Sequence, residues 1–163
     1  MNIMKKTFLL LSLLLISACG FEPIYSSNPS TSAKLADIEI SNIPDYEGQY
    51  LRNALIDRFY PNARPINARY ILNVSPVQES TTNLDITKNA NTTRTQLKLS
   101  TRINLIDQQS GEAILTRHLK AISSYNVLTS EFATRVSAKN MRENTLDDLA
   151  RQIEIQIGLY LKR

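Results

Sequence analysis

The chain has 163 residues, with 19 lysines and arginines, 15 aspartates and glutamates, one histidine, one cysteine and no tryptophan. A formal charge of +4 on this length is too small to favour nucleic acid as a partner. The single cysteine excludes an intrachain disulfide, so the fold must be held together by its hydrophobic core.

The N-terminal segment has the order of a bacterial secretion signal. Two lysines precede a strongly apolar run at residues 8–16, interrupted only by Ser12, and Ser17, Ala18 and Cys19 follow it. The run is too short to cross about 30 Å of hydrocarbon, which favours a cleaved signal over a transmembrane helix. Its last residues resemble the lipobox of bacterial lipoproteins, which implies that residues 1–18 are removed and that Cys19 carries S-diacylglycerol and N-acyl lipid. The alternative, an ordinary signal with a chance cysteine, would leave an odd thiol in an oxidising compartment.

The lipid and the residue after the cysteine predict a location. Two or more acyl chains hold a protein firmly in a leaflet, whereas one chain binds weakly. In lipoprotein sorting, an aspartate after the cysteine usually retains the protein in the inner membrane, and this chain has Gly20 there. We therefore expect a lipid-anchored protein on the periplasmic face of the outer membrane of a Gram-negative cell. Without Lys5 and Lys6, 17 basic and 15 acidic residues give the mature chain a formal charge of about +2.

One domain, residues 35–163, is expected after a flexible tether at residues 19–34, whose second half is rich in serine, asparagine and proline. Residues 35–43 alternate as a strand that Pro44 ends. The apolar spacing at 46–59 predicts an amphipathic helix.

A second strand is expected at 69–77, where Pro76 marks an exit or an edge. Residues 78–92 are long and polar, so they are predicted to be a loop that is either functional or mobile. Residues 93–105 form the clearest strand, because odd positions carry Leu97, Leu99, Ile103 and Leu105 whereas the even positions are polar. A hairpin at 107–111, ending on a glycine, leads into a return strand at 113–127.

The last predicted element is a helix capped by Thr129 or Ser130 and running to Leu161. Its buried stripe is expected to comprise Leu146, Leu149, Ala150, Ile153, Ile157, Tyr160 and Leu161. The order strand, helix, strand, strand, strand, helix predicts an α+β fold. We expect a single four-stranded mixed sheet with two helices packed on one face, its first two strands parallel through a right-handed crossover.

Four groups of residues resemble the LPS-assembly lipoprotein family LptE, in its alphaproteobacterial branch. They are CGFEPIY at 19–25, GQYLRNAL at 48–55, SYNV at 124–127 with SEFAT at 130–134, and LARQI at 149–153 with LYL at 159–161. The resemblance implies a non-enzymatic protein that sits in the lumen of the outer-membrane barrel LptD as a plug and folding partner, binds lipopolysaccharide (LPS) and helps deliver it to the outer leaflet. The alternative function is a periplasmic adaptor or pilot lipoprotein for another outer-membrane complex.

An LPS ligand carries phosphates, which lysine and arginine bind best. The polar face of the 93–105 strand offers Arg94, Lys98 and Arg102, and the last helix opens with Arg135, Lys139 and Arg142. The position of Lys88 in the 78–92 segment allows it to lie near either group of basic residues. The candidate LPS-binding residues are Lys88, Arg94, Lys98, Arg135 and Lys139, with Lys88 and Lys139 supported by position in the family resemblance as well as charge. The alternative for each is an ordinary solvated side chain.

Catalysis and metal binding have little support. His118, the single histidine, has the strand parity opposite to Leu115 and Leu119, so we expect a solvated residue. Asp147 and Asp148 are adjacent on a helix and diverge, which suits metal binding poorly. No enzyme activity, metal or cofactor is expected apart from the covalent lipid on Cys19.

Overall fold

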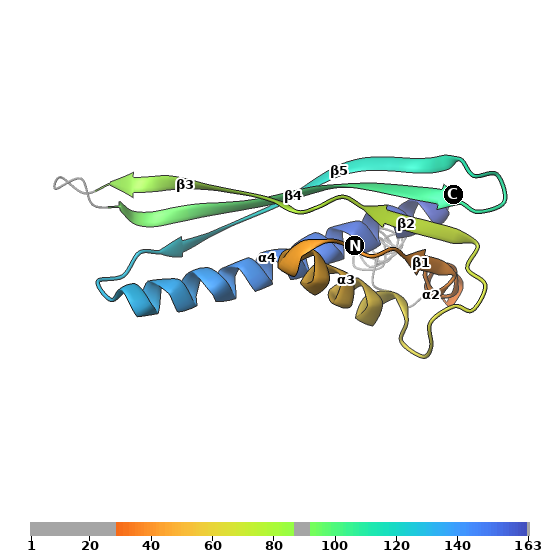
Figure 1. The fold of residues 1–163 in the computed structure, drawn as a ribbon, viewed down its shortest axis with the longest axis horizontal. Coiled ribbons are helices and arrows are strands. Elements are labelled where there is room, and N and C mark those ends of the chain that lie inside the picture. Colours follow the sequence, from red (N-terminus) through yellow and green to blue (C-terminus); the bar gives the residue numbers. More distant parts are fainter. Residues whose placement is uncertain (1–28, 87–91, 163) are drawn as a thin grey trace, which may run out of the picture.

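The computed structural model describes residues 29–86 and 92–162, and the predicted signal peptide, Cys19 and Lys88 lie outside these ranges. The elements in chain order are α2 (Pro29–Ala36), β1 (Ile38–Ile40), α3 (Asp45–Phe59), β2 (Tyr70–Val74), β3 (Gln78–Ile86), β4 (Thr92–Asp107), β5 (Ala113–Asn126) and α4 (Glu131–Leu161). The predicted α+β class is confirmed, with helices beneath one mixed sheet (Figure 1). The sheet has five strands rather than the four expected.

The sheet is organised around β4. One edge of β4 pairs antiparallel with β5 along nearly its whole length, and the other edge pairs with β2 and then β3, which follow one another end to end. β1 pairs parallel with β2, as the crossover through α3 predicts. The hairpin between β4 and β5 turns at Gly111, whose φ of +72° suits a residue without a side chain.

The prediction of a loop at 78–92 is wrong for its first part, because residues 78–86 form β3. Pro76 interrupts the β2–β3 edge and has no backbone N–H to give. Around it, the Ser75 amide donates to the Arg102 carbonyl at 2.9 Å and the Thr101 hydroxyl donates to the Ser75 carbonyl at 2.7 Å. Residues 78–84 are exposed, so β3 lacks the apolar alternation by which a strand is recognised in a sequence.

A second difference lies at the start of the domain. Residues 29–36 form helix α2, where the sequence predicted the end of a tether and the start of a strand, and β1 is only three residues long. Leu35 of α2 is buried in the core. The Lys34 Nζ donates to the Leu161 carbonyl at 2.6 Å, so a cation neutralises the negative C-terminal end of α4.

α3 begins abruptly after Pro44. Asp45 takes a φ of +67°, and the chain turns so tightly that Gly48 lies against Ile43. A Cβ on Gly48 would stand 2.8 Å from the Ile43 Cγ2 and 3.0 Å from its carbonyl carbon and oxygen. The glycine is therefore required by this close approach, although it weakens helix propensity.

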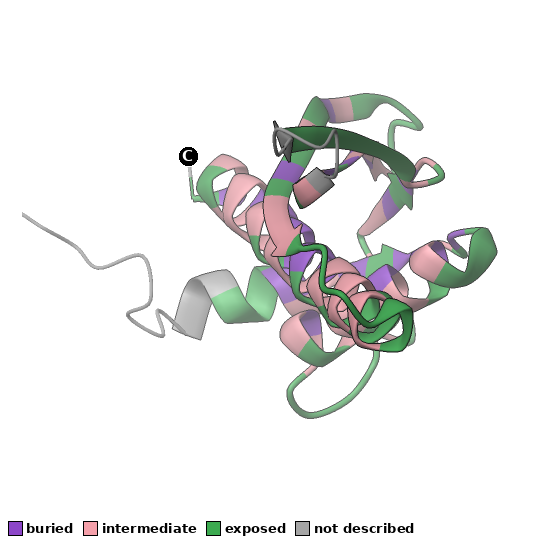
Figure 2. Cartoon of the chain, turned by 90° about the vertical axis from the view of Figure 1, so that its left-hand side faces the viewer, coloured by how far each residue is buried: buried purple, intermediate pink, exposed green. Residues whose placement is uncertain are grey.

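The core lies between the sheet and α3 and α4, and Figure 2 colours the backbone of its buried residues purple. Ser130 caps α4 as predicted, with its hydroxyl accepting from the Ala133 amide. The predicted stripe of α4 is buried except for Tyr160, which is half-buried, and Thr145 joins it. None of residues 131–144 is buried. The first half of α4 therefore extends beyond the core, on the side where β3 and β5 end and β4 begins (Figure 1).

Candidate functional site

The cations predicted on the long strand lie together on the sheet face that points away from the helices. Leu97, Leu99 and their odd-numbered neighbours are buried against the helix layer, so Arg94, Lys98 and Arg102 face outward and are exposed. The guanidinium of Arg94 donates to the Ser124 hydroxyl through Nε at 3.0 Å and Nη2 at 2.7 Å.

Strand β5 adds two residues to this face that the sequence did not bring together. In the β4–β5 register, Lys120 lies opposite Ser100 and His118 lies opposite Arg102. Directly opposed residues on antiparallel strands share a face, so Lys120 and His118 stand beside the β4 cations, and both are exposed. We call Lys98, Arg102, His118 and Lys120 the outer basic face. In the sequence, this alignment of Lys120 and His118 with the β4 cations could be found only by counting residues along both strands from the hairpin turn at Gly111.

The outer basic face has no carboxylate among its described neighbours. Residues sharing the face on β3 and β5 are Gln78, Ser80, Thr82, Thr116, Ile122 and Ser124. Glu79 has the opposite parity and faces α4, and Asp85 lies opposite Arg94, beyond the end of the face. Among the described residues, the charged side chains on the stretch from Lys98 to Arg102 are therefore all basic.

The cations of α4 belong to a different surface, because α4 packs under the opposite side of the sheet. Arg135 pairs with Glu131 at 2.5 Å and Lys139 with Glu143 at 3.9 Å, each one helical turn apart. The two predicted basic groups are therefore not one site. Those of α4 also have carboxylate partners that compete with any anionic ligand.

Arg142 connects helix α4 to the sheet through an ion pair. Its Nε and Nη2 donate to the two carboxylate oxygens of Glu79 at 2.6 and 2.8 Å, and Glu47 of α3 lies 3.9 Å away. Hydrogen bonds from Arg142 hold the pKa of Glu79 below its usual range, and the same bonds raise the pKa of Arg142. Arg142 thus joins α4 to β3 just where α4 leaves the core.

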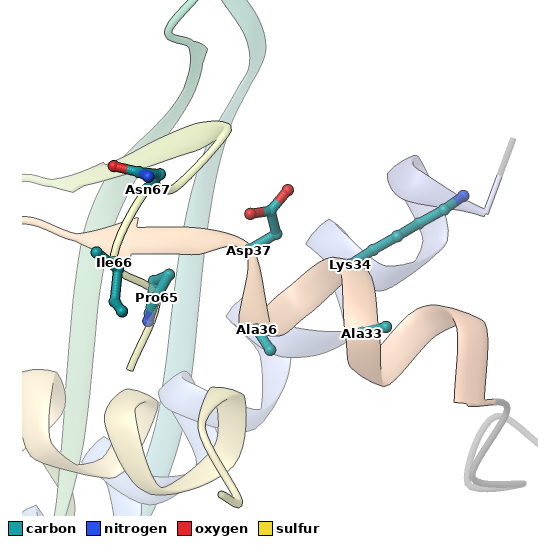
Figure 3. Close-up of a pocket in the computed structure, with 7 residues that line it drawn as sticks. All are labelled: Ala33, Lys34, Ala36, Asp37, Pro65, Ile66 and Asn67. Carbon is teal, nitrogen blue, oxygen red and sulfur yellow. The ribbon is translucent and has the colours of Figure 1, made fainter. Parts of the chain in front are cut away.

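Exposed apolar side chains gather where β5 passes into α4. They are Val127, Leu128, Phe132 and Val136, and Phe132 is 77% exposed. At the other end of α4, an open depression of about 430 Å³ lies between α2 with the following Asp37 and the loop before β2 (Figure 3). Its only lysine, Lys34, extends toward the end of α4, whose last carbonyl it already binds.

Groups suited to catalysis do not converge in the described residues. His118 is exposed on β5, as expected. Asp147 and Asp148 have separate partners, since Tyr50 donates to Asp147 at 3.3 Å whereas Asp148 pairs with Arg151. Residues 29–86 and 92–162 contain no cluster of three or more metal-ligating side chains. None of the helices described there has the length and apolar character needed to cross a membrane.

One family model matches most of the chain. The profile of the family described as LptE, Lipopolysaccharide-assembly, matches residues 35–158. An uncharacterized protein of Rickettsia prowazekii (strain Madrid E) is 28% identical over 160 residues, which cover 98% of this chain and 99% of that protein.

Solved structures share the fold. A lipoprotein from Caulobacter crescentus CB15 matches with a TM-score of 0.63 at 19% identity, covering 82% of this chain and 97% of its own. Rare lipoprotein B from Shewanella oneidensis matches with a TM-score of 0.58 at 11% identity, covering 77% and 97%. At these identities, the likeness extends to the sheet and helices and not to individual side chains.

Proposed function

Because the chain belongs to the LptE family of lipopolysaccharide-assembly proteins, we propose that it is an outer-membrane lipoprotein that partners and plugs the LPS translocon barrel LptD. In this role it supports assembly of the barrel and delivery of LPS to the outer leaflet, by binding rather than by catalysis. The observation that carries the proposal is the family match, which extends through residues 35–158 and so includes all five strands and most of α4.

Two features of the chain support this role. Cys19 follows a signal-like segment and precedes the domain by a short stretch, which suits a lipid anchor that holds the domain close to a membrane. The outward face of the sheet is polar, with serine, threonine, asparagine and basic side chains, as suits a protein enclosed by the polar lumen of a barrel.

Co-purification tests the partner. The full chain, tagged at its C-terminus, is isolated in detergent from outer membranes, and we expect an outer-membrane barrel in equimolar amount. Mass spectrometry of the mature N-terminus should show an acylated Cys19, and Cys19→Ser should abolish both the acylation and the membrane retention. Recovery of a different outer-membrane complex in place of the barrel would instead favour an adaptor or pilot role.

Glycolipid contact at the head of α4 is tested separately. Lys139 is 64% exposed and only loosely paired with Glu143, so it remains available to a phosphate. The double reversal Lys88→Glu with Lys139→Glu should weaken LPS capture by the purified protein. Unchanged affinity would count against these two positions without affecting the assignment of the barrel as partner.

A further inference from the structure

The end of the molecule where α2 lies also holds the loop between α3 and β2, the β4–β5 hairpin and the C-terminal end of α4 (Figure 1). Cys19 precedes Pro29, the first residue of α2, by ten positions, which a fully extended chain spans in about 35 Å at most. The 31 residues of α4 extend about 46 Å away from this end. An acyl group on Cys19 therefore keeps the α2 end within reach of a membrane, whereas the start of α4 is beyond that reach unless the domain lies flat.

The loop at residues 60–69 has the composition of a segment that lies on a lipid surface. It carries Arg64 and Arg69 and no acidic residue, and its Ile66 is 96% exposed. Lipid-surface segments combine basic side chains, which meet headgroup phosphates, with apolar ones that enter the acyl boundary. The apolar side chains that line the depression beside Ile66 are Ala33, Ala36 and Pro65 (Figure 3). The isoleucine thus belongs to a wider apolar surface that the loop shares with α2.

The same loop is held in place at its base. The Arg69 amide donates to the Asp37 carbonyl at 3.0 Å, and Gln108 of the hairpin donates through Nε2 to the Ala68 carbonyl at 2.9 Å. Two prolines within the loop restrict its backbone further. A lone exposed apolar side chain is common on protein surfaces, but this one is displayed by a fixed loop. Burying it against another surface therefore costs little additional ordering.

We propose that the loop at residues 60–69 and the adjoining side of α2 rest on the phospholipid leaflet that holds the acyl chains of Cys19. Ile66 enters the boundary between headgroups and acyl chains, and Arg64 binds headgroup phosphate. Such a contact is weak by itself, but the anchor makes it intramolecular, so the effective concentration of lipid is high enough for a weak contact to orient the domain. The contact rests on the proposed function, since the lipid on Cys19 is part of that function.

The test uses the full-length acylated protein in vesicles of phosphatidylethanolamine and phosphatidylglycerol, both alone and as the complex that co-purifies with it. Because the thiol of Cys19 is acylated, a thiol-directed fluorophore labels only an introduced cysteine. The two labelled variants are Asn67→Cys and its matched control Asn140→Cys on the first half of α4, and both asparagines are exposed. A nitroxide on the upper acyl chain of the lipid should quench the label at position 67 at least about threefold more than the label at position 140.

Two further substitutions identify the contact. In the Asn67→Cys background, Ile66→Ser and Arg64→Ser should each lower the quenching by about half or more. Leu128→Ser, a comparable change at an exposed apolar side chain of the opposite end, should leave the quenching unchanged.

Three results would overturn the membrane contact. They are equal quenching at the two labelled positions, quenching at position 67 that persists in Ile66→Ser and Arg64→Ser, and protection of that label from both the lipid nitroxide and aqueous iodide. The last result would show that protein, either the barrel or residues 19–28, covers the loop. If the contact fails while Cys19 is acylated and the barrel co-purifies, the proposed function stands; a mature chain without lipid on Cys19 would contradict both.

Discussion

The ion pair between Arg142 and Glu79 should stabilise the first half of α4 against the sheet. No side chain from 131 to 144 is buried, so little apolar contact holds this half to the sheet. Arg142 meets Glu79 with two charge-assisted hydrogen bonds of 2.6 and 2.8 Å, and both side chains are 30% exposed. Exposed ion pairs contribute about 0.2–1 kcal/mol, and a bidentate, half-buried pair belongs at the upper end.

A double-mutant cycle of Glu79→Gln and Arg142→Met should therefore give a coupling free energy of about 1 kcal/mol at pH 7. For a domain of this size, a loss of about 1 kcal/mol lowers the melting temperature by about 3 °C. Hydrogen exchange of the amides in residues 131–142 should accelerate in Glu79→Gln. The exposed hairpin variant Glu112→Gln serves as the control and should change neither quantity.

The coupling should also depend on pH. Because Arg142 lowers the pKa of Glu79 in the folded protein, its contribution to stability is complete above the unfolded glutamate pKa of about 4.3. It is lost as the pH falls from there through the lower folded pKa. The difference between wild type and Glu79→Gln should accordingly shrink in this acidic range. A coupling near zero at pH 7, with unchanged exchange in α4, would refute the reasoning.

Three further predictions concern the fold, and urea unfolding of each variant measures them. Gly48→Ala gains helix propensity but brings a Cβ to 2.8 Å from Ile43, so we expect the free energy of unfolding to fall by about 1–2 kcal/mol. A variant more stable than wild type would contradict the close approach. Lys34→Met removes the cation from the end of α4 at Leu161 and should cost about 0.5–1 kcal/mol, whereas no change would mean that the contact is inert in solution. Leu149→Ala, at a side chain with no exposed surface, should cost about 3–5 kcal/mol, and a loss below about 1 kcal/mol would show that the site is not a packed core.

The parts of the fold that bury one face were predictable. Strand β4 was recognised because its leucines and Ile103 fall on odd positions between polar even ones, and α4 was recognised by the stripe through Leu149 and Ile153. β3 was missed because its residues 78–84 are all exposed, so hydrogen bonding to β4 rather than burial makes it a strand. α2 was missed because its polar composition resembles a linker, although Leu35 packs into the core.

The candidate site was predictable only along a single strand. The spacing of Lys98 and Arg102 places them on one face without any structure. The addition of Lys120 depends on the β4–β5 register, and the separation of the α4 cations depends on which face of the sheet the helix covers. Both features depend on the tertiary structure, which the spacing of residues along the chain does not determine.

Depletion of the protein from its own cell tests the central claim most directly. LPS accessible at the outer surface is measured by labelling intact cells as the protein is withdrawn. A role in LPS assembly predicts that newly made LPS stops reaching the surface and accumulates on the inner side, and that the wild-type chain restores it. Surface LPS that continues to appear at its normal rate after the protein is gone would contradict the claim.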